Sequence, residues 1–474
     1  MAVEYDLVVI GGGSGGLMVA GVAAALKAKV ALVEKHRLGG DCLWYGCVPS
    51  KSLIHASRVA YQMKHAGRFG IYCNEPQIDF AKAIAHVQRV ISTIQPHDSP
   101  ERFEGLGAEV IFGDGKFIDR KTFEVNNRRL KARAFVIATG SRPAVLPIEG
   151  LQQAGYITNE EVFSITERPD SLAIIGGGPI GCELGQAFSR LGSKVTIIAS
   201  RDRLLSKEDP ELVEVIHRQF ASEGIRFLLN SKVDSVEVAD GKKYIWVGKE
   251  KIAADEILVA AGRQPNVESL NLDAAGVKLS QQGIKVNSLL QTTNPRIYAC
   301  GDVIGGYQFT HVAGYQANVV VKNALFLPVF QADNKVIPWA TFTDPELARV
   351  GLTEQEARDR YGDDVYVVKQ EFADVDRAQT EATTEGFAKI ITRRNGQILG
   401  AHIVGPAAGE LIHEIVLAMS HKLKISALGG IHIYPTLAEI NSKAAFEQTK
   451  QNYEKNYRLQ QLLKQLFHFL RRLG

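Results

Sequence analysis

A strand-like run, a glycine-rich turn and a helical segment occur in that order twice in this chain of 474 residues. Residues 5–10 precede Gly11-x-Gly13-x-x-Gly16, and residues 172–175 precede Gly176-x-Gly178-x-x-Gly181. Each helical segment is followed by a second apolar run, which completes a strand–helix–strand unit. Such units are typical of dinucleotide-binding sheets. Two copies about 165 residues apart therefore predict two successive doubly wound domains.

The rest of the chain divides by its pattern. The sequence predicts helices over 50–65 and 80–94 and hairpin strands around 108–131. The segments 136–143 and 257–266 match each other and close the two nucleotide-binding parts. From about residue 338 strands and helices alternate without a glycine turn. The predicted fold class is α/β, with two doubly wound domains and a smaller C-terminal α+β domain.

Composition excludes some classes of protein. The chain is 45% hydrophobic and 23% charged, as in ordinary globular proteins, and its net charge of +3 is too small for a polyanion binder. We therefore expect no nucleic-acid partner. No signal-like segment precedes the first strand, and no apolar run approaches the roughly 18 residues of a membrane-spanning helix. The expected location is cytoplasmic.

The first glycine turn predicts an FAD site. Glu34 ends the second strand of its unit, 18 residues after Gly16. A carboxylate there suits a free ribose diol, as in the adenosine half of FAD. Glycines let the pyrophosphate approach the backbone, and the helix N-terminus favours its charge. The expected contacts are Gly11, Gly13, Ser14, Gly16 and Glu34.

The second turn predicts a nicotinamide cofactor. No carboxylate occupies the first position after its second strand, where Ala199-Ser200-Arg201-Asp202-Arg203 follow. Ser200, Arg201 and Arg203 suit a 2′-phosphate and favour NADPH. The alternative is that the arginines form a solvated turn, that Asp202 contacts the ribose and that the cofactor is NADH. The remaining expected contacts are Gly176, Gly178, Gly181 and Gly262.

Two cysteines, Cys42 and Cys47, are separated by four residues shortly after the first unit. The chain has five cysteines, an odd and sparse number that argues against a secreted disulfide framework. Cys73, Cys182 and Cys300 are expected to be buried or incidental thiols. The pair is expected near the first turn of a helix, where the dipole favours a thiolate. The alternatives are a structural disulfide or a zinc pair, but no clustered Cys or His completes a tetrahedral site, so no bound metal is expected.

The run Gly39-Gly40-Asp41-Cys42-Leu43-Trp44-Tyr45-Gly46-Cys47-Val48-Pro49-Ser50-Lys51 resembles the redox centre of the flavin-dependent pyridine nucleotide–disulfide oxidoreductases. This family includes dihydrolipoamide dehydrogenase, glutathione reductase and mercuric reductase. The resemblance extends from about residue 4 to about 450. It implies that electrons pass from NADPH through FAD to a Cys42–Cys47 disulfide, and from the dithiol to an acceptor. It also implies a homodimer, because the acceptor site draws on the partner chain.

The resemblance implies a role for individual residues. Cys47 is the flavin-facing thiolate and Cys42 the interchange thiol, while Lys51 lies near the flavin and pairs with Glu183. Asp302 contacts the ribityl or pyrophosphate part of the flavin, and Thr139, Gly140 and Ser141 complete the expected FAD site. The implied division is an FAD domain over 1–150 with a return segment over 271–337, an NAD(P) domain over 151–270, an interface domain over 338–452 and a basic amphipathic helix over 453–474.

The acid–base site departs from the pattern of the dithiol–disulfide enzymes in the family. They use a histidine before Pro-Thr, backed by a glutamate five residues on. Here Tyr434 replaces the histidine, while Glu439 is in place. A tyrosine hydroxyl, with a pKa near ~10, is a poor base at neutral pH. His432, two residues away, is the alternative base.

Tyr434 makes the chain similar to the mercuric reductase branch, in which a hydroxyl near the thiols helps to hold the metal ion. Two features depart from that branch. The chain has no cysteine after Cys300, where mercuric reductases carry a delivery pair. Trp44 and Asp41 replace small polar residues of the redox loop. The expected acceptor is a soft metal ion or a small disulfide, with dihydrolipoamide dehydrogenase-like or glutathione reductase-like activity as the alternative.

Leucines recur at helical spacing over 455–473, and the remaining positions are rich in lysine and arginine. One interpretation is a helix that packs on its own dimer. Another is a helix that docks on a membrane surface or a partner protein. This helix and Tyr434 also leave open a second class of function: a flavoprotein redox sensor or membrane-docked electron-transfer partner.

Overall fold

The computed structural model describes residues 3–72 and 74–473, and Cys73 lies outside the described residues. The chain forms two compact units. The first contains residues up to Asp202 together with Gly224–Asp333, and the second contains Arg203–Glu223 together with the residues from Asn334 onward. Among the described residues, no helix is both long enough and apolar enough to cross a membrane.

The main sheet of the first unit has the strand order β3-β2-β1-β6-β5-β4, and β16 also pairs with β6. The strands β3, β2, β1, β6 and β16 are joined by parallel pairing, whereas β4, β5 and β6 form antiparallel hairpins. The bounds are β1 Tyr5–Ile10, β2 Val30–Glu34, β3 Ala108–Phe112, β4 Gly115–Asp119, β5 Thr122–Val125, β6 Arg128–Ile137 and β16 Ile297–Ala299.

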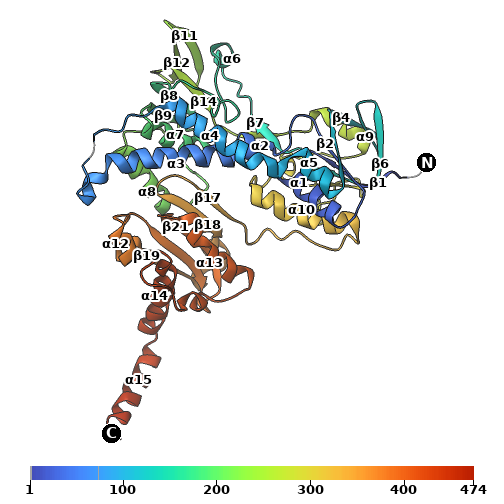
Figure 1. Cartoon of the computed structure of the whole chain (residues 1–474). Helices are drawn as coiled ribbons and strands as arrows, with labels where there is room; N and C mark the ends of the chain where they lie inside the picture. The colour runs from blue at the N-terminus through green and yellow to red at the C-terminus, as the bar shows by residue number, and fades with distance from the viewer. Residues whose placement is uncertain (1–2, 73, 474) are drawn as a thin grey trace. The chain divides into compact units, whose positions relative to one another are not determined.

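Both faces of this sheet are buried, because successive side chains of a strand point to opposite faces. Leu7 and Val9 of β1 pack in one apolar cluster with α1 (Ser14–Ala25) and α10 (Thr310–Leu325). Val8 and Ile10 pack in another cluster on the opposite face. Figure 1 shows α1 and α10 side by side, in contact below the strands. This layering positions the β1–α1 turn at the carboxyl end of a central strand, which pairs with β2 on one side and β6 on the other.

The helix after the first glycine turn is short. Lys27 has a φ of 67°, in the left-handed region that a continuing right-handed helix cannot contain, so α1 ends at Ala25. The helix predicted from residue 50 begins earlier, at Cys47, as α3 (Cys47–Lys64). It therefore starts at the second cysteine of the pair.

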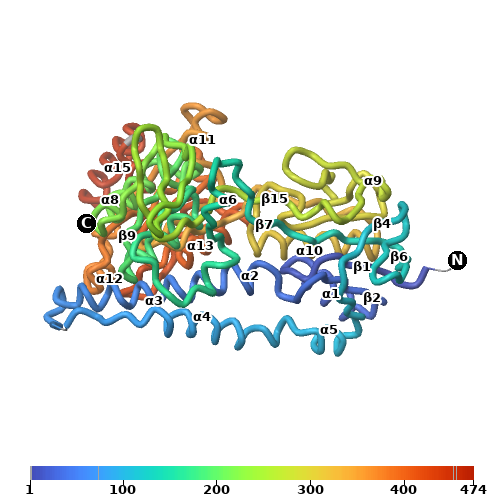
Figure 2. The backbone as a smooth tube through the Cα atoms, turned by 90° about the horizontal axis from the view of Figure 1, so that it is seen from above, coloured from blue at the N-terminus to red at the C-terminus, as the bar shows by residue number. Residues whose placement is uncertain are grey.

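Two long helices, α3 and α4 (Phe80–Ile94), contact each other and run side by side along the first unit (Figure 2). The Asp79 carboxylate caps α4 by accepting the Lys82 N–H at 3.0 Å. The buried positions of α4 recur at helical spacing, at Phe80, Ile84, Val87 and Ile91. The shorter helices of this unit are α2 Gly40–Trp44, α5 Pro100–Leu106, α6 Leu151–Ala154 and α9 Leu272–Ala275.

The second glycine turn lies in a smaller parallel sheet of order β10-β9-β8-β14, covered by α7 (Pro179–Arg190). An antiparallel sheet of β11, β12 and β13 lies beside it, and β15 pairs with β7 in a separate ribbon. The bounds are β7 Ser141–Pro143, β8 Ser171–Ile175, β9 Lys194–Ile198, β10 Arg226–Leu228, β11 Ser235–Ala239, β12 Lys242–Val247, β13 Glu250–Ala254, β14 Glu256–Val259 and β15 Arg263–Pro265.

The second unit is built on an antiparallel sheet of order β17-β18-β21-β20-β19. Its core joins the sheet to α13, α14 and the segment around Leu428. The strands are β17 Pro338–Thr341, β18 Glu346–Gly351, β19 Val365–Glu371, β20 Phe387–Arg393 and β21 Ile398–Gly405. The helices are α8 Pro210–Ser222, α11 Glu354–Tyr361, α12 Asp376–Thr380, α13 Ala408–Ser420, α14 Glu439–Lys455 and α15 Tyr457–Leu470.

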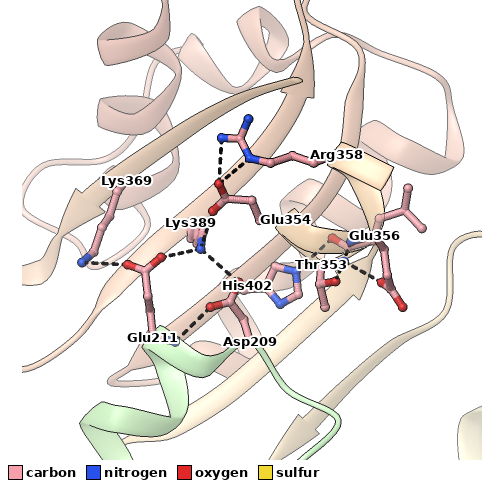
Figure 3. Close-up of polar contacts among 10 residues, drawn as sticks. Asp209, Glu211, Thr353, Glu354, Glu356, Arg358, Lys369, Lys389 and His402 are labelled. Carbon is pink, nitrogen blue, oxygen red and sulfur yellow. Dashed lines mark hydrogen bonds and ion pairs between the residues drawn. The ribbon is translucent and has the colours of Figure 1, made fainter. Parts of the chain in front are cut away.

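A buried lysine fastens α8 to this sheet (Figure 3). Lys389 on β20 is 3% exposed, and its Nζ donates to Asp209 Oδ2 at 3.0 Å, Glu211 Oε1 at 2.5 Å and Glu354 Oε2 at 2.8 Å. Three carboxylates around one ammonium group offset the cost of burying that charge. His402, fully buried on β21, lies beside the same cluster.

The C-terminal helical pattern is interrupted at Asn456. α14 ends at Lys455, and the Asn456 side chain accepts the Leu459 N–H at 3.1 Å to cap α15. The helix expected over 453–474 is therefore the end of α14 followed by a separate α15. In Figure 1, α15 (red) extends away from the sheet of its unit beyond α14.

Candidate active site

The first glycine turn closes tightly on itself. A Cβ on Gly16 would lie 1.8 Å from the Gly11 carbonyl oxygen, so only glycine fits this crossing of helix and strand. A Cβ on Gly13 would lie 3.7 Å from the nearest atom, the Gly40 Cα. The turn is therefore closed where helix and strand meet and open where a pyrophosphate would approach.

The second turn repeats this geometry. A Cβ on Gly181 would lie 2.0 Å from the Gly176 carbonyl oxygen, and a Cβ on Gly178 would meet nothing within 4 Å. Gly178 precedes α7 as Gly13 precedes α1. The two copies thus present equivalent openings at helix N-termini, where an anion is favoured.

Glu34 lies at the end of β2 and turns back over the first glycine turn. Its Oε2 accepts the Gly12 N–H at 2.7 Å, and its Oε1 accepts the His36 N–H at 2.8 Å. Ser14 is the first residue of α1 on the same turn. The structure therefore brings together the residues expected to bind the adenosine and pyrophosphate of FAD.

The remaining expected FAD residues meet near the ends of β6 and β16. The Ser141 hydroxyl donates to Asp302 Oδ2 at 2.7 Å, and burial raises the pKa of the Asp302 carboxyl. The Thr139 hydroxyl donates to the Asn266 carbonyl oxygen at 2.7 Å. Gly140 has a φ of 66° and open space at its Cβ position. This cradle fits a flavin dinucleotide, whose hydroxyl groups would find a carboxyl and a serine here.

Asp41, the residue before the first cysteine, joins the redox loop to this cradle. Its Oδ1 accepts from Asn159 Nδ2 at 3.2 Å and lies 3.2 Å from an Arg263 guanidinium nitrogen. Arg263 also donates to the Ser141 hydroxyl at 2.7 Å. Asn159 donates to the Tyr45 carbonyl oxygen as well, at 3.1 Å. The loop containing the cysteines is thus held by side chains from two distant segments, those of Asn159 and Arg263.

The two cysteines lie on successive helices. Cys42 is in α2 and partly buried, whereas Cys47 is the first residue of α3 and exposed. The sulfur of Cys47 lies 3.4 Å from the Thr310 hydroxyl oxygen. Thr310 begins α10, so residues far apart in the chain converge on this thiol.

The two thiols titrate as a pair. The hydrogen bond from Cys42 lowers the pKa of the Cys47 thiol to about 6, helped by the Thr310 hydroxyl and the Lys51 charge, while burial and Asp41 oppose the shift. The same hydrogen bond and burial raise the pKa of Cys42. At neutral pH the pair is therefore a Cys47 thiolate beside a neutral Cys42 thiol.

The ion pair expected between Lys51 and Glu183 is present. Lys51 Nζ on α3 donates to Glu183 Oε2 on α7 at 2.8 Å, and Glu183 is 6% exposed. Glu183 lies one turn from the start of α7, the helix that follows the second glycine turn. The pair thus links the helix of the redox cysteine to the helix of the nicotinamide site.

The three residues expected to bind the 2′-phosphate of the nicotinamide cofactor differ in how far they are buried. Ser200 and Arg201 follow β9 and are exposed. Arg203 is partly buried and donates to the Ser206 carbonyl oxygen of its own loop at 3.1 Å. Gly262, with a φ of 100°, precedes β15.

The Tyr434 hydroxyl donates to Asp376 Oδ2 at 2.7 Å, and this carboxylate raises the pKa of the hydroxyl. Tyr434 is 67% exposed. The expected backing residue, Glu439, instead accepts the Thr436 N–H at 3.4 Å. The tyrosine is therefore a firmly protonated hydroxyl group and not a base.

His432 makes its contacts within the second unit. Its Nε2 lies 3.0 Å from Glu414 Oε1, and its Nδ1 lies 2.9 Å from the Gly430 carbonyl oxygen. The ring is thus oriented by a carboxylate, as a general base would be. In the part of the chain that the structure describes, no group of three or more Cys, His, Asp or Glu side chains is arranged to hold a metal ion.

Two family profiles match the chain. The pyridine nucleotide-disulphide oxidoreductase profile matches residues 5–317, and the dimerisation domain of the same family matches residues 337–445. This chain belongs to the pyridine nucleotide-disulphide oxidoreductase family. It is therefore an FAD-binding oxidoreductase that takes electrons from NAD(P)H and acts through a disulfide redox centre.

Curated relatives of this oxidoreductase include two kinds of enzyme. It is 38% identical to a mercuric reductase of Staphylococcus aureus over 92% of this chain and 81% of the relative. It is 36% identical to a dihydrolipoyl dehydrogenase of Geobacillus stearothermophilus over 94% of this chain and 96% of the relative. Both relatives support the family assignment, but their names state different activities.

Solved structures agree with the fold. The copper(II) complex of the HOCl-induced flavoprotein disulfide reductase RclA from Escherichia coli is similar with a TM-score of 0.85, at 28% identity over 94% of this chain and all of that one. LpdA from Mycobacterium tuberculosis is similar with a TM-score of 0.86, at 26% identity over 93% of this chain and 99% of that one.

Sequence reasoning missed four residues that the structure brings to these sites. Thr310 faces Cys47, Arg263 and Asn159 hold Asp41, and Asp376 accepts from Tyr434. Each lies at least 58 positions from its partner, and Thr310, Asn159 and Asp376 belong to no local motif that marks them. Arg263 alone carried a signal, because it lies in the segment 257–266 that matches the segment 136–143.

Proposed function

We propose that this enzyme reduces a soft metal ion, as a mercuric reductase does, with electrons from NADPH. The overall reaction converts NADPH and Hg(II) to NADP⁺, a proton and elemental mercury, which balances both electrons and charge. The mercuric reductase relatives support this acceptor. The copper(II) complex of the structurally similar RclA supports a metal ion as a ligand within the family.

The observation that carries the proposal is the Tyr434 hydroxyl. A disulfide acceptor takes up two protons as it becomes two thiols, so its reduction needs a residue that exchanges protons at neutral pH. A metal ion that becomes a neutral atom takes up none. Tyr434 replaces the expected base, and its hydrogen bond to Asp376 raises the pKa of its hydroxyl further. A hydroxyl group that stays protonated suits a metal-ion acceptor better than a disulfide acceptor.

Individual residues of the chain have separate roles in this reaction. The Cys47 thiolate and the Cys42 thiol, once deprotonated, bind the metal ion through sulfur, the ligand that soft metals prefer. When bound, FAD would supply the two-electron chemistry that links the hydride of the nicotinamide to the metal ion held by the two sulfurs. The ion pair between Lys51 and Glu183, 2.8 Å long, orients the flavin site and the nicotinamide site relative to each other. Asp41, held by Asn159, fixes the redox loop.

The test is anaerobic NADPH oxidation by the purified holoenzyme, with and without Hg(II) presented as a complex with excess small thiol. We expect turnover that depends on mercury and that falls about tenfold or more in Tyr434→Phe, in line with the loss of one group that contacts the reacting ion. Cys42→Ser and Cys47→Ser should abolish it. His432→Gln is the matched control and should retain the activity. Flavin reduction without turnover, or inhibition by Hg(II), contradicts the proposal.

A second candidate is the reduction of a small disulfide. The observation that favours it is the contact between His432 Nε2 and Glu414 Oε1 at 3.0 Å, an orienting pair for a general base. The dihydrolipoyl dehydrogenase relatives support it as well. Turnover with lipoamide or glutathione disulfide that is lost in His432→Gln but kept in Tyr434→Phe would establish this function instead.

We also propose NADPH as the preferred donor, a homodimeric state and the domain division given by the sequence. Ser200 and Arg201 are exposed after β9, where a 2′-phosphate would lie. The dimerisation domain over 337–445 supports the homodimer. The assay above, run with NADPH and NADH, tests the first point: a higher kcat/KM with NADH contradicts it. Sedimentation velocity tests the second.

A further inference from the structure

The C-terminal helix α15 is amphipathic and stands apart from the core of its unit. No residue of α15, all of which the structure describes, is buried. Its leucines recur at positions 459, 462, 463, 466 and 470 and so lie on one face of the helix. Several large apolar side chains are exposed: Leu462 by 61%, Phe469 by 58%, Phe467 by 52% and Leu466 by 43%. A single helix with such a face needs an apolar surface to cover it.

The opposite face of α15 is cationic. Lys464, His468 and Arg471, which directly follows the helix, are spaced by four and three residues and therefore lie on that side. Five lysines and arginines occur from residue 455 onward, and no aspartate or glutamate occurs there. The net charge of the whole chain is only +3, so the rest of the chain carries a net negative charge. The positive charge of this protein is concentrated on the same short segment as its exposed apolar face.

We propose that α15 docks this enzyme on the surface of an anionic lipid bilayer, lying parallel to the membrane plane. Leucine and phenylalanine side chains would enter the boundary between headgroups and acyl chains, and the lysine and arginine side chains would face the anionic headgroups. The family's dimerisation domain ends at residue 445, before α15 begins at Tyr457. Two copies of α15 would bring like charges together, which disfavours pairing between them. The proposal does not depend on the electron acceptor.

The test is co-sedimentation of the full-length holoenzyme with vesicles of phosphatidylcholine, with and without phosphatidylglycerol. We expect binding to the vesicles that contain phosphatidylglycerol and a loss of binding as salt rises, because the Debye length falls from about 10 Å at 0.1 M to about 3 Å at 1 M. Leu462→Gln with Leu466→Gln should weaken binding at least about tenfold by removing apolar area. Lys464→Gln with Arg471→Gln should do the same by removing charge.

The matched control is Gln461→Ser with Gln465→Ser, which changes two positions of the polar face and should leave binding unchanged. Flavin reduction by NADPH in each variant verifies that the protein remains folded. Failure of the wild-type protein to bind phosphatidylglycerol vesicles overturns the proposal, as does equal binding by the leucine variant. Dissociation of the oligomer by the leucine variant in the absence of lipid, measured by sedimentation velocity, would assign α15 to a contact between copies and would also overturn it.

Discussion

At the scale of single residues, the Cys47 thiol is acidic because donors and a cation surround it. Cys42 donates to it, the Thr310 hydroxyl lies 3.4 Å from its sulfur, and Lys51 contributes positive charge. These favour the thiolate more than burial and Asp41 disfavour it. Cys300, buried without such donors, has its pKa raised to about 12. The difference between these thiols comes from their surroundings and not from their residue type.

Thr310→Val should raise the pKa of Cys47 above its value of about 6, because valine keeps the shape of threonine and removes the hydroxyl group that faces the sulfur. Thr310→Ser keeps a hydroxyl group and should raise it less. The measurement is the rate of alkylation of the reduced enzyme as a function of pH, with Cys47→Ser as the background to subtract. Equal pKa values in the wild-type, valine and serine proteins would contradict the prediction.

At the scale of elements, the glycines of α1 differ in what a methyl group would meet. A Cβ on Gly16 would lie 1.8 Å from a backbone oxygen. A Cβ on Gly21, two turns from the start of the same helix, would lie 3.5 Å from the Phe103 ring, an ordinary contact distance. The motif glycine is therefore required by packing, whereas Gly21 only lowers the helix propensity of α1.

Gly16→Ala should yield protein without bound FAD, because the helix must move away from β1 and the turn must open. Gly21→Ala, the same substitution in the same helix, should retain FAD and stabilise the first unit by about 0.5–1 kcal/mol. The flavin absorbance of the purified proteins and their urea unfolding midpoints measure the two effects. Normal flavin content in Gly16→Ala would contradict the prediction.

At the scale of the whole molecule, polar groups buried in the second unit hold α8 to the sheet. Lys389 is surrounded by carboxylates, and Trp339 Nε1 donates to Glu208 Oε1 at 2.8 Å. His402, in the same region, is fully buried. Burial, followed by the Arg349 charge, lowers its pKa to about 4. Because the folded protein holds this imidazole neutral, protonation of His402 favours the unfolded chain.

Acid should therefore destabilise the second unit through His402. The unfolded chain binds a proton at His402 below a pH of about 6.5, whereas the folded chain does so only near about 4. The stabilisation is complete above the first value and is lost as the pH falls toward the second, by about 3 kcal/mol in all. His402→Gln should remove this part of the pH dependence.

The measurement is urea unfolding at several pH values between these limits, followed by fluorescence of Trp339. Trp44→Phe and Trp246→Phe are introduced in both proteins, so that the signal reports on the second unit alone. The wild-type midpoint should fall more steeply with acid than the midpoint of the His402→Gln protein. Parallel curves for the two proteins would contradict the assigned role of His402.

Features that depend on a local pattern of residues could be predicted from the amino-acid sequence alone. The glycine turns, the strands beside them and the cysteine pair all have signatures within a few residues. Both repeats folded as predicted, because a turn, a strand and a helix packed this closely tolerate only glycine at the crossing. The family and its cofactors followed from these motifs.

The distant side chains that complete the sites could be identified only once the chain was seen folded. Thr310 beside Cys47, Asn159 and Arg263 beside Asp41, and Asp376 beside Tyr434 meet through the topology of the sheets. Such contacts leave no periodic pattern in the sequence. A hydrogen bond between remote segments constrains the identity of two residues and does not constrain the identity of their neighbours. The ends of α1 and α14 were also decided in this way, by single residues whose backbone leaves the helical region.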